Sequence, residues 1–198
     1  MSNMLEQFYR EYMEEMQILG LSDDSDSFVY GHGDPKSPIV LIGEAPGAEE
    51  VKSKVPFVGQ AGKNLNDRLE AGGISRKEVF VTNAIKYRLC EENPKTKKLR
   101  NRPATAQDIR GNSRWLRMEM EIIKPKVIIT LGRVPLKCLL PETNYQMAEI
   151  HGQSLETELG TVIPLYHPAS IIYNRELTEI FEGDFNSMIE TVKGLLSK

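Results

Sequence analysis

The sequence is poor in cysteine and has no long apolar run. Cys90 and Cys138 are its only cysteines and form no CxxC pair, which argues against a disulfide framework and against a zinc site. No apolar run approaches the roughly 20 residues that a transmembrane helix needs. Residues 1–16 carry acids where a secretory signal needs bases and apolar residues. We therefore expect a cytoplasmic protein of a reducing compartment, without a membrane partner.

Motifs of several enzyme classes are also absent. The segment "GEAPG" at 43–47 has a glycine spacing that matches neither a Walker loop nor a dinucleotide-binding fingerprint. No serine or cysteine sits in a nucleophile elbow, so the sequence does not support a covalent hydrolase mechanism. The composition, 40% hydrophobic and 27% charged, is that of an ordinary globular protein. A length of 198 residues predicts one domain over residues 1–198, which we expect to act as a monomer.

The net charge of −3 hides two segments of opposite sign. Residues 1–30 contain seven acids and one base, whereas residues 86–102, "KYRLCEENPKTKKLRNR", contain seven bases and two acids. A basic run of this kind favours a loop that faces anions, phosphates among them. The alternative is an ordinary solvated loop, and the run by itself does not decide between the two.

Four apolar, β-branched runs are typical of strands covered on both faces, because they do not alternate with polar residues. They are 38–43, 79–84, 126–132 and 161–167. Helical patterns separate these runs, and strands that alternate with helices form parallel sheets. We therefore predict an α/β fold, a three-layer α/β/α sandwich with a four-stranded parallel sheet.

Capping signals and periodicity predict the helices. The run 61–73 stops at a glycine pair, and "TAQD" at 105–108 resembles a capping box that opens a helix reaching Ile123. Apolar stripes of helical period predict a first helix with Leu5 to Leu19 on its inner face. A similar stripe predicts a last helix that begins near Asp184.

Polar side chains stand at the ends of three of the four predicted strands. Glu44 follows the first strand, Asn83 ends the second and His167 ends the fourth. Ligands of an open parallel sheet bind beyond the carboxyl ends of its strands, beside glycines that allow close approach. Each residue alone has a structural explanation: a helix cap, a turn residue and a loop histidine. Their convergence at one edge favours a binding or catalytic site.

Four motifs, in order, resemble those of the uracil-DNA glycosylases. They are "GEAPGAEE…VPFVGQAG", "VTNAIKYR", "IIKPKVIITLG" and "HPAS", and the similarity runs from Ile39 to about Asn174. The branch that they resemble most is family four, the iron–sulfur type. The resemblance implies the glycosylase α/β/α fold and, as substrate, DNA that contains uracil or another deaminated base.

The resemblance implies that the sheet edge binds a flipped-out base. Such enzymes rotate the target nucleotide out of the duplex into a pocket. Phe57 would stack on this base, and Asn83 would bind its polar edge, since an amide both donates and accepts hydrogen bonds. Gly43 and Ala45 would offer backbone groups around the base.

The resemblance assigns the chemistry to two residues. His167 would hydrogen-bond the O2 side of the base, where negative charge grows as the glycosidic bond breaks. Glu44 would orient or deprotonate water and offset positive charge on the sugar. We expect the DNA backbone to be bound by glycine, serine and basic residues, namely Gly59, Lys86, Arg88, Lys97, Lys98, Arg100, Arg102 and Ser170.

The sequence departs from family four at the metal site. That family holds a [4Fe–4S] cluster on four cysteine thiolates, two of them in the N-terminal region, where this chain reads "LGLSDDSDSFVYGHG". A third belongs to a "KCR" motif, with Tyr87 in its place here, and the fourth falls near Asn112. We therefore predict no iron–sulfur cluster, no other metal and no cofactor.

The last motif departs as well. Family four often reads "HPS" followed by "LLR", whereas this chain has "HPASIIYN", with Ala169 replacing a hydroxyl and Tyr173 standing where an arginine often lies. A related branch bonds covalently to its DNA product through a histidine after the asparagine motif. No histidine lies between His32 and His151, so we do not expect that chemistry.

Three functions follow from these patterns. The leading one is a monofunctional glycosylase that excises uracil or a related base in repair. The second is a nucleic-acid-binding protein that kept the pocket and lost turnover together with the cluster. The third is an α/β enzyme that acts on a nucleoside.

Overall fold

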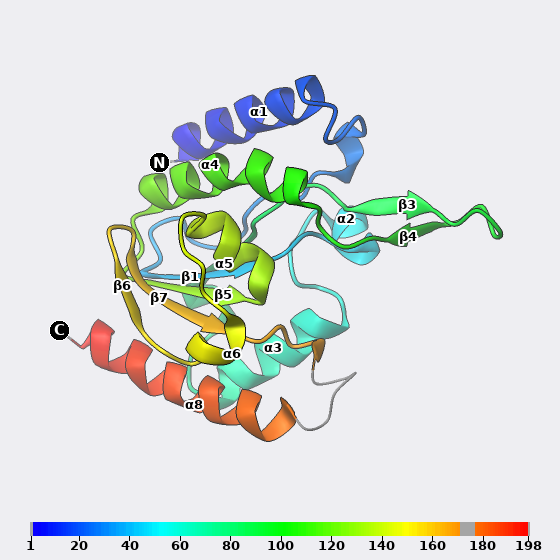
Figure 1. Cartoon of the computed structure of the whole chain (residues 1–198). Helices are drawn as coiled ribbons and strands as arrows, with labels where there is room; N and C mark the ends of the chain where they lie inside the picture. The colour runs from blue at the N-terminus through cyan, green and yellow to red at the C-terminus, as the bar shows by residue number, and fades with distance from the viewer. Residues whose placement is uncertain (1, 171–176, 198) are drawn as a thin grey trace.

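A central sheet lies between two layers of helices in this computed structural model, which describes residues 2–170 and 177–197 (Figure 1). The predicted α/β/α architecture is confirmed. The strands lie in the order β2-β1-β5-β7-β6. The four predicted strands form a parallel set, namely β1 (Ile39–Gly43), β2 (Val79–Asn83), β5 (Val127–Leu131) and β7 (Gly160–Leu165).

Within the described part of the chain the sheet has five strands, so the predicted number of four is one too few. The fifth, β6 (Leu155–Thr157), pairs antiparallel with β7 through a tight turn that ends at Gly160. Gly160 has a φ of +117°, a conformation that side chains disfavour. The strand was not predicted because it has three residues, two of them polar, and lies at a partly exposed edge.

Both faces of the sheet are buried, which explains the continuous apolar runs. On β1, Val40 and Ile42 enter the core on the side of α1 (Ser2–Ile18), α4 (Ala106–Ile123) and α5 (Arg133–Leu139). The alternate residues Ile39 and Leu41 enter the opposite core, with α3 (Gln60–Ala71) and α8 (Leu177–Leu196). Strand side chains point alternately to opposite faces, so one strand serves both cores.

The helix predictions differ from the structure at their ends. The predicted capping box is confirmed, since the Thr105 side chain accepts a hydrogen bond from the Asp108 amide, 3.1 Å away. Helix α1 ends at Ile18, and Leu19 is 48% exposed rather than on the inner face. Helix α8 already begins at Leu177, ahead of the predicted start near Asp184. The other short helical elements of the described residues are α2 (Ala48–Ser53), α6 (Met147–Ile150) and two 3₁₀ turns, η1 (Ser25–Ser27) and η2 (Arg76–Glu78).

The basic segment 86–102 is a hairpin rather than a plain loop. Strands β3 (Cys90–Glu92) and β4 (Leu99–Asn101) pair antiparallel and project from the body of the protein (Figure 1). Among the described residues, no helix combines the length and the apolar character needed to cross a bilayer.

Candidate active site

A cleft of about 260 Å³ lies at the carboxyl ends of the parallel strands. It brings together residues from segments that are far apart in the chain. Its wall includes six of the predicted residues, namely Glu44, Ala45, Phe57, Gly59, Asn83 and His167. Strand register explains part of this, because Gly43 at the end of β1 pairs with Asn83 at the end of β2.

Gly43 allows the aromatic ring and the amide to meet. A Cβ atom on this residue would lie 2.5 Å from Cζ of Phe57 and 2.5 Å from Oδ1 of Asn83, closer than atoms pack. Phe57 is 8% exposed and has a φ of +59°, which is uncommon for a residue other than glycine. Backbone strain of this kind persists where the surrounding structure holds it, often at ligand sites.

Glu50 fastens the two glycine-rich loops to each other, a role that the sequence analysis missed. Its Oε2 accepts from the Gly47 amide at 3.1 Å, and its Oε1 accepts from the Gly59 amide at 2.8 Å. Since Gly59 opens α3 and Gly47 opens α2, one carboxylate fixes the loops on both sides of Phe57. The glutamate three residues after a helix N-cap was the available signal.

Glu44 is held by the backbone at the end of β2. Its carbonyl accepts from the Ile85 amide at 3.0 Å, and the Ala104 backbone near its carboxylate acts to lower the pKa of that group. Burial raises the pKa of Glu44, and the nearby Asp108 carboxylate raises it further. This environment suits a carboxylate that meets a developing positive charge, because a desolvated anion interacts strongly with a cation.

His167 presents one ring nitrogen to the cleft. Its Nδ1 accepts a hydrogen bond from the Ala169 amide at 3.1 Å, so that nitrogen carries no proton. Burial lowers the pKa of His167, which favours the neutral ring. A neutral ring with an accepting Nδ1 has its proton on Nε2, where it can donate to a bound base. The Ser170 hydroxyl donates to the His167 carbonyl at 2.6 Å, so it shapes this loop.

The predicted DNA contact of Lys86 does not fit the structure, because this lysine lies in the interior. Its side chain is completely buried and forms an ion pair with Glu119 on α4 at 2.7 Å. Its ammonium group also donates to the Asn83 carbonyl, and Thr82 and Tyr9 donate to the same glutamate at 3.1 and 2.5 Å. This buried ion pair therefore lies directly beneath the candidate base-binding residue Asn83.

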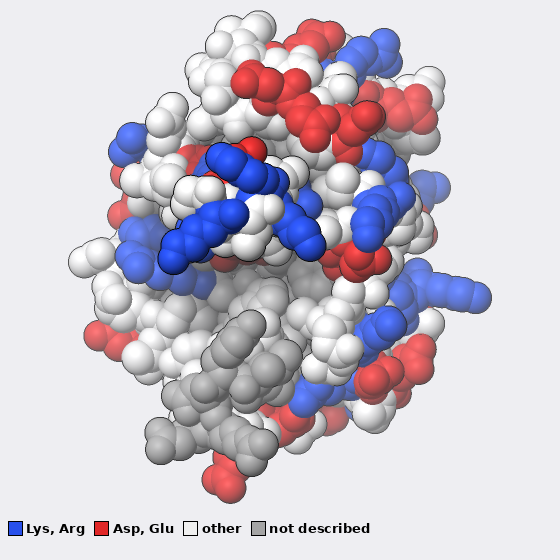
Figure 2. Space-filling model, turned by 90° about the vertical axis from the view of Figure 1, so that its right-hand side faces the viewer, with Lys and Arg blue, Asp and Glu red and all other residues white. Residues whose placement is uncertain are grey.

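Five of the other predicted DNA-binding residues, Arg88, Lys97, Lys98, Arg100 and Arg102, lie on or beside the hairpin. Figure 2 looks onto this side of the molecule, where Lys and Arg side chains gather in the middle and acidic side chains gather above them. Lys97 and Arg100 form exposed ion pairs with Glu92 and Glu91, and Lys98 is exposed. Such exposed pairs are weak and exchange readily for phosphate.

Two predicted phosphate contacts are engaged elsewhere. Arg88 donates from Nε to Oδ1 of Asn101 at 2.9 Å, and Asn101 lines the cleft. Arg102 is held in a two-point ion pair with Asp108. The sequence analysis missed Asn101 because this residue reaches the cleft only through the hairpin. No local pattern indicated that strands β3 and β4 pair. Tyr173 lies outside the described residues.

The residues at two of the expected cluster positions do not suit a cluster. Nδ2 of Asn112 donates to the Tyr87 hydroxyl at 3.2 Å, so the two positions are neighbours in space. A phenol and an amide supply no thiolate, the ligand that iron–sulfur clusters need. Over residues 2–170 and 177–197, no group of three or more histidines, cysteines or acids is placed to hold a metal ion. The absence of a cluster remains a prediction.

Comparison with known proteins agrees with this geometry. The family model for the uracil DNA glycosylase superfamily matches residues 30–191. The chain belongs to this superfamily. A type-4 uracil-DNA glycosylase of Sulfurisphaera tokodaii is 37% identical over 82% of this chain and 73% of its own length.

Two further relatives of the superfamily have the same name. The type-4 uracil-DNA glycosylase of Archaeoglobus fulgidus is 32% identical over 94% of this chain and 92% of its own length. That of Thermotoga maritima is 33% identical, with coverage of 86% and 83%. The similarity therefore extends over most of each chain.

Proposed function

We propose that this protein is a monofunctional DNA glycosylase that hydrolyses the N-glycosidic bond of uracil, or of a related deaminated base, in base excision repair. One observation carries the proposal. Glu44, Phe57, Asn83 and His167 come from four separate segments and line one cleft in a member of the uracil DNA glycosylase superfamily. The names of the type-4 relatives agree with it.

The base would bind between the ring of Phe57 and the amide of Asn83. A flat apolar ring is a good partner for a flat pyrimidine, and the amide can donate and accept at adjacent atoms of its edge. A base enters such a cleft only after it has left the duplex, so the target nucleotide must flip. The close packing of both side chains against Gly43 fixes the width of this slot.

The glycosidic bond breaks with both electrons passing to the base. The proton on Nε2 of His167 then stabilises the negative charge at the base oxygen. Water adds to the sugar carbon and loses a proton, for which Glu44 is the acceptor in the cleft. Its carboxylate also offsets the positive charge that the sugar develops. No step requires a metal or a cofactor, and we propose that the protein uses neither.

DNA would lie across the hairpin face, with phosphates near Lys97, Lys98 and Arg100. These side chains are exposed on the same hairpin that brings Asn101 to the cleft. We further propose that the protein acts as a monomer in a reducing, cytoplasmic compartment, in keeping with its two free cysteines.

The test is release of free base from oligonucleotides that contain uracil, hypoxanthine or xanthine. Under single-turnover conditions, Glu44→Gln and His167→Ala should each slow release by about a hundredfold or more while DNA binding changes little. Glu49→Gln is the matched control, because this acid is exposed on α2 and pairs with Lys52. It should behave as wild type.

A second function is favoured by the loss of cysteine at Tyr87 and Asn112. The protein would then be a DNA-binding member of the superfamily without turnover. Tight DNA binding by wild type, with no release of base from any of the three substrates, would support this function and exclude the glycosylase.

A further inference from the structure

The segment that leaves the hairpin, residues 101–105, reaches the candidate active site at its first residue. We call it the strap. Asn101 at its start lines the cleft together with Glu44, and the Ala104 backbone is near enough to the Glu44 carboxylate to offset part of the rise in the pKa of that group. The strap runs from Asn101, the last residue of β4, to Thr105, the N-cap of α4, and residues 102–105 are irregular. Its position therefore depends on whatever anchors it to the body of the protein.

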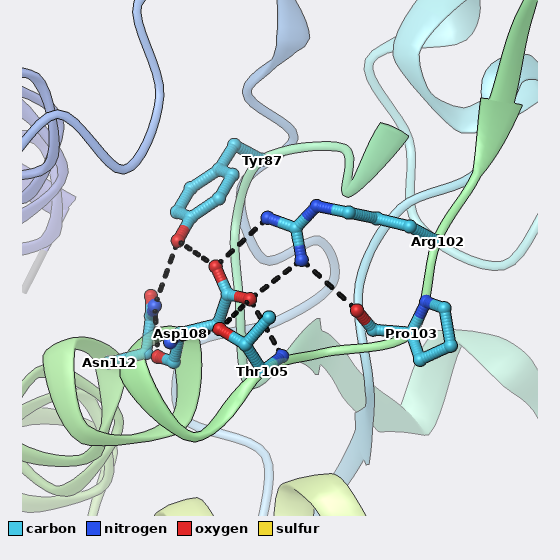
Figure 3. A network of polar contacts seen from close by, with 6 residues as sticks. All are labelled: Tyr87, Arg102, Pro103, Thr105, Asp108 and Asn112. Carbon is cyan, nitrogen blue, oxygen red and sulfur yellow. Dashed lines mark hydrogen bonds and ion pairs between the residues drawn. The ribbon is translucent and has the colours of Figure 1, made fainter. Parts of the chain in front are cut away.

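Asp108 on α4 is the centre of that anchor (Figure 3). Its carboxylate accepts from the Arg102 guanidinium at 2.7 and 3.1 Å and from the Thr105 amide and hydroxyl, each at 2.7 Å. Asp108 is only 1% exposed. Although burial opposes it, these hydrogen bonds lower the pKa of Asp108, so the carboxylate is ionised when the strap is in place.

The anchor continues into the body of the protein through Tyr87 and Asn112. The Tyr87 hydroxyl lies 3.5 Å from Oδ1 of Asp108 and accepts from Asn112 at 3.2 Å. Asn112 in turn accepts a short hydrogen bond from Tyr12 on α1. In Figure 3, Tyr87 and Asn112 point toward Asp108 from one side and Arg102 points toward it from the other. A continuous polar chain thus joins α1, α4 and the strap.

We propose that Arg102, Asp108, Tyr87 and Asn112 form a brace that positions the strap against Glu44 and the base slot, at the place where family-four proteins would carry a metal cluster. The proposal rests on the glycosylase function proposed above and concerns how its site is held. Tyr87 and Asn112 occupy two of the expected cysteine positions, and both belong to the brace. Arg102 is accordingly a positioning residue and not a phosphate contact.

The contacts of Arg102 distinguish these two roles. Its guanidinium makes two hydrogen bonds to Asp108 and one to the Pro103 carbonyl, and its side chain is 25% exposed. Bidentate arginine–carboxylate pairs with a buried partner are strong and directional. A phosphate would have to displace Asp108 and leave a buried carboxylate without its cation, which is costly.

The decisive variant is Arg102→Gln, studied by single-turnover base release at saturating DNA and by DNA binding at several salt concentrations. We expect the rate constant to fall on the order of tenfold or more, because small displacements of positioned groups slow catalysis strongly. The salt dependence of binding should not change. If Arg102 instead binds a phosphate, the slope of log K against log salt will be less steep in the variant by about one. The rate of base release at saturating DNA will then stay the same.

Hydrogen exchange tests the brace without using activity. In Arg102→Gln the amides of Ala104 and Thr105 should exchange faster, since the bonds that hold the strap are lost. Arg114→Gln is the matched control: it removes the same charge from an exposed ion pair with Glu15 on the other side of α4. Neither its exchange nor its rate of base release should change.

Tyr87→Phe provides a milder variant in case Arg102→Gln does not fold. It keeps the ring and removes only the hydroxyl. Base release should therefore slow, and the strap amides should exchange faster, each by less than in Arg102→Gln. Unchanged exchange in the strap of both variants would overturn the proposal, whether or not wild type releases base. Inactive wild type with faster exchange in the variants would instead refute the glycosylase function and leave the brace in place.

Discussion

The buried ion pair between Lys86 and Glu119 gives the sharpest prediction about stability. Both side chains have no exposed surface, and they meet at 2.7 Å. Lys86→Met would keep most of the side-chain volume and remove the ammonium group. The glutamate would keep its hydrogen bonds from Thr82 and Tyr9 but lose the buried cation with which it pairs. Breaking one partner of such a pair typically costs about 3–5 kcal/mol of unfolding free energy.

For a chain of 198 residues this loss corresponds to a fall in melting temperature of roughly 10 °C. Differential scanning calorimetry of wild type and variant at neutral pH measures it. The double variant Lys86→Met/Glu119→Gln should recover a large part of the loss, because no unpaired charge remains. Lys52→Met is the control, since its ion pair with Glu49 is 72% and 65% exposed and should contribute less than about 1 kcal/mol.

A single Lys86→Met variant that melts within about 2 °C of wild type, less than a change of 1 kcal/mol would produce, would refute this reasoning. It would mean that Glu119 does not depend on the lysine. The lysine also donates to the Asn83 carbonyl. We therefore expect base release by the folded variant to slow as well, which the same protein preparation can show.

Four further predictions address the site. Gly43→Ala should abolish most base release by pushing the Phe57 ring out of the slot, as measured in single-turnover assays on folded protein. The rate should fall at low pH as Glu44 takes up a proton, at a pH above that of an ordinary carboxyl because burial raises its pKa, and a pH–rate profile locates that fall. Neutralising Lys97 and Lys98 together should lower the salt slope of DNA binding by about two, as binding titrations at several salt concentrations will show. Protein purified without oxygen should contain no iron, and near-stoichiometric iron by metal analysis would contradict that expectation.

Periodicity and residue type were enough to predict the parallel sheet and the edge at which the cleft lies. Glu44, Asn83 and His167 could be found because the carboxyl ends of parallel strands meet in space whatever the loops do. The apolar runs of β1 and β2 could be recognised as strands because both faces of the sheet are buried. These are local signals, each contained within a few residues.

Tertiary structure alone decided the parts that depend on contacts between distant segments. Lys86 looked like a surface base, and only the packing of α4 against β2 places a glutamate beside it. Asn101 reaches the cleft because the two strands of the hairpin pair with each other. Arg102 pairs with Asp108 because the strap leads into the first turn of α4. A charge pattern records which groups are present. It does not show which of these groups will be buried next to one another. That burial determines whether a basic residue binds DNA or holds the protein's own backbone.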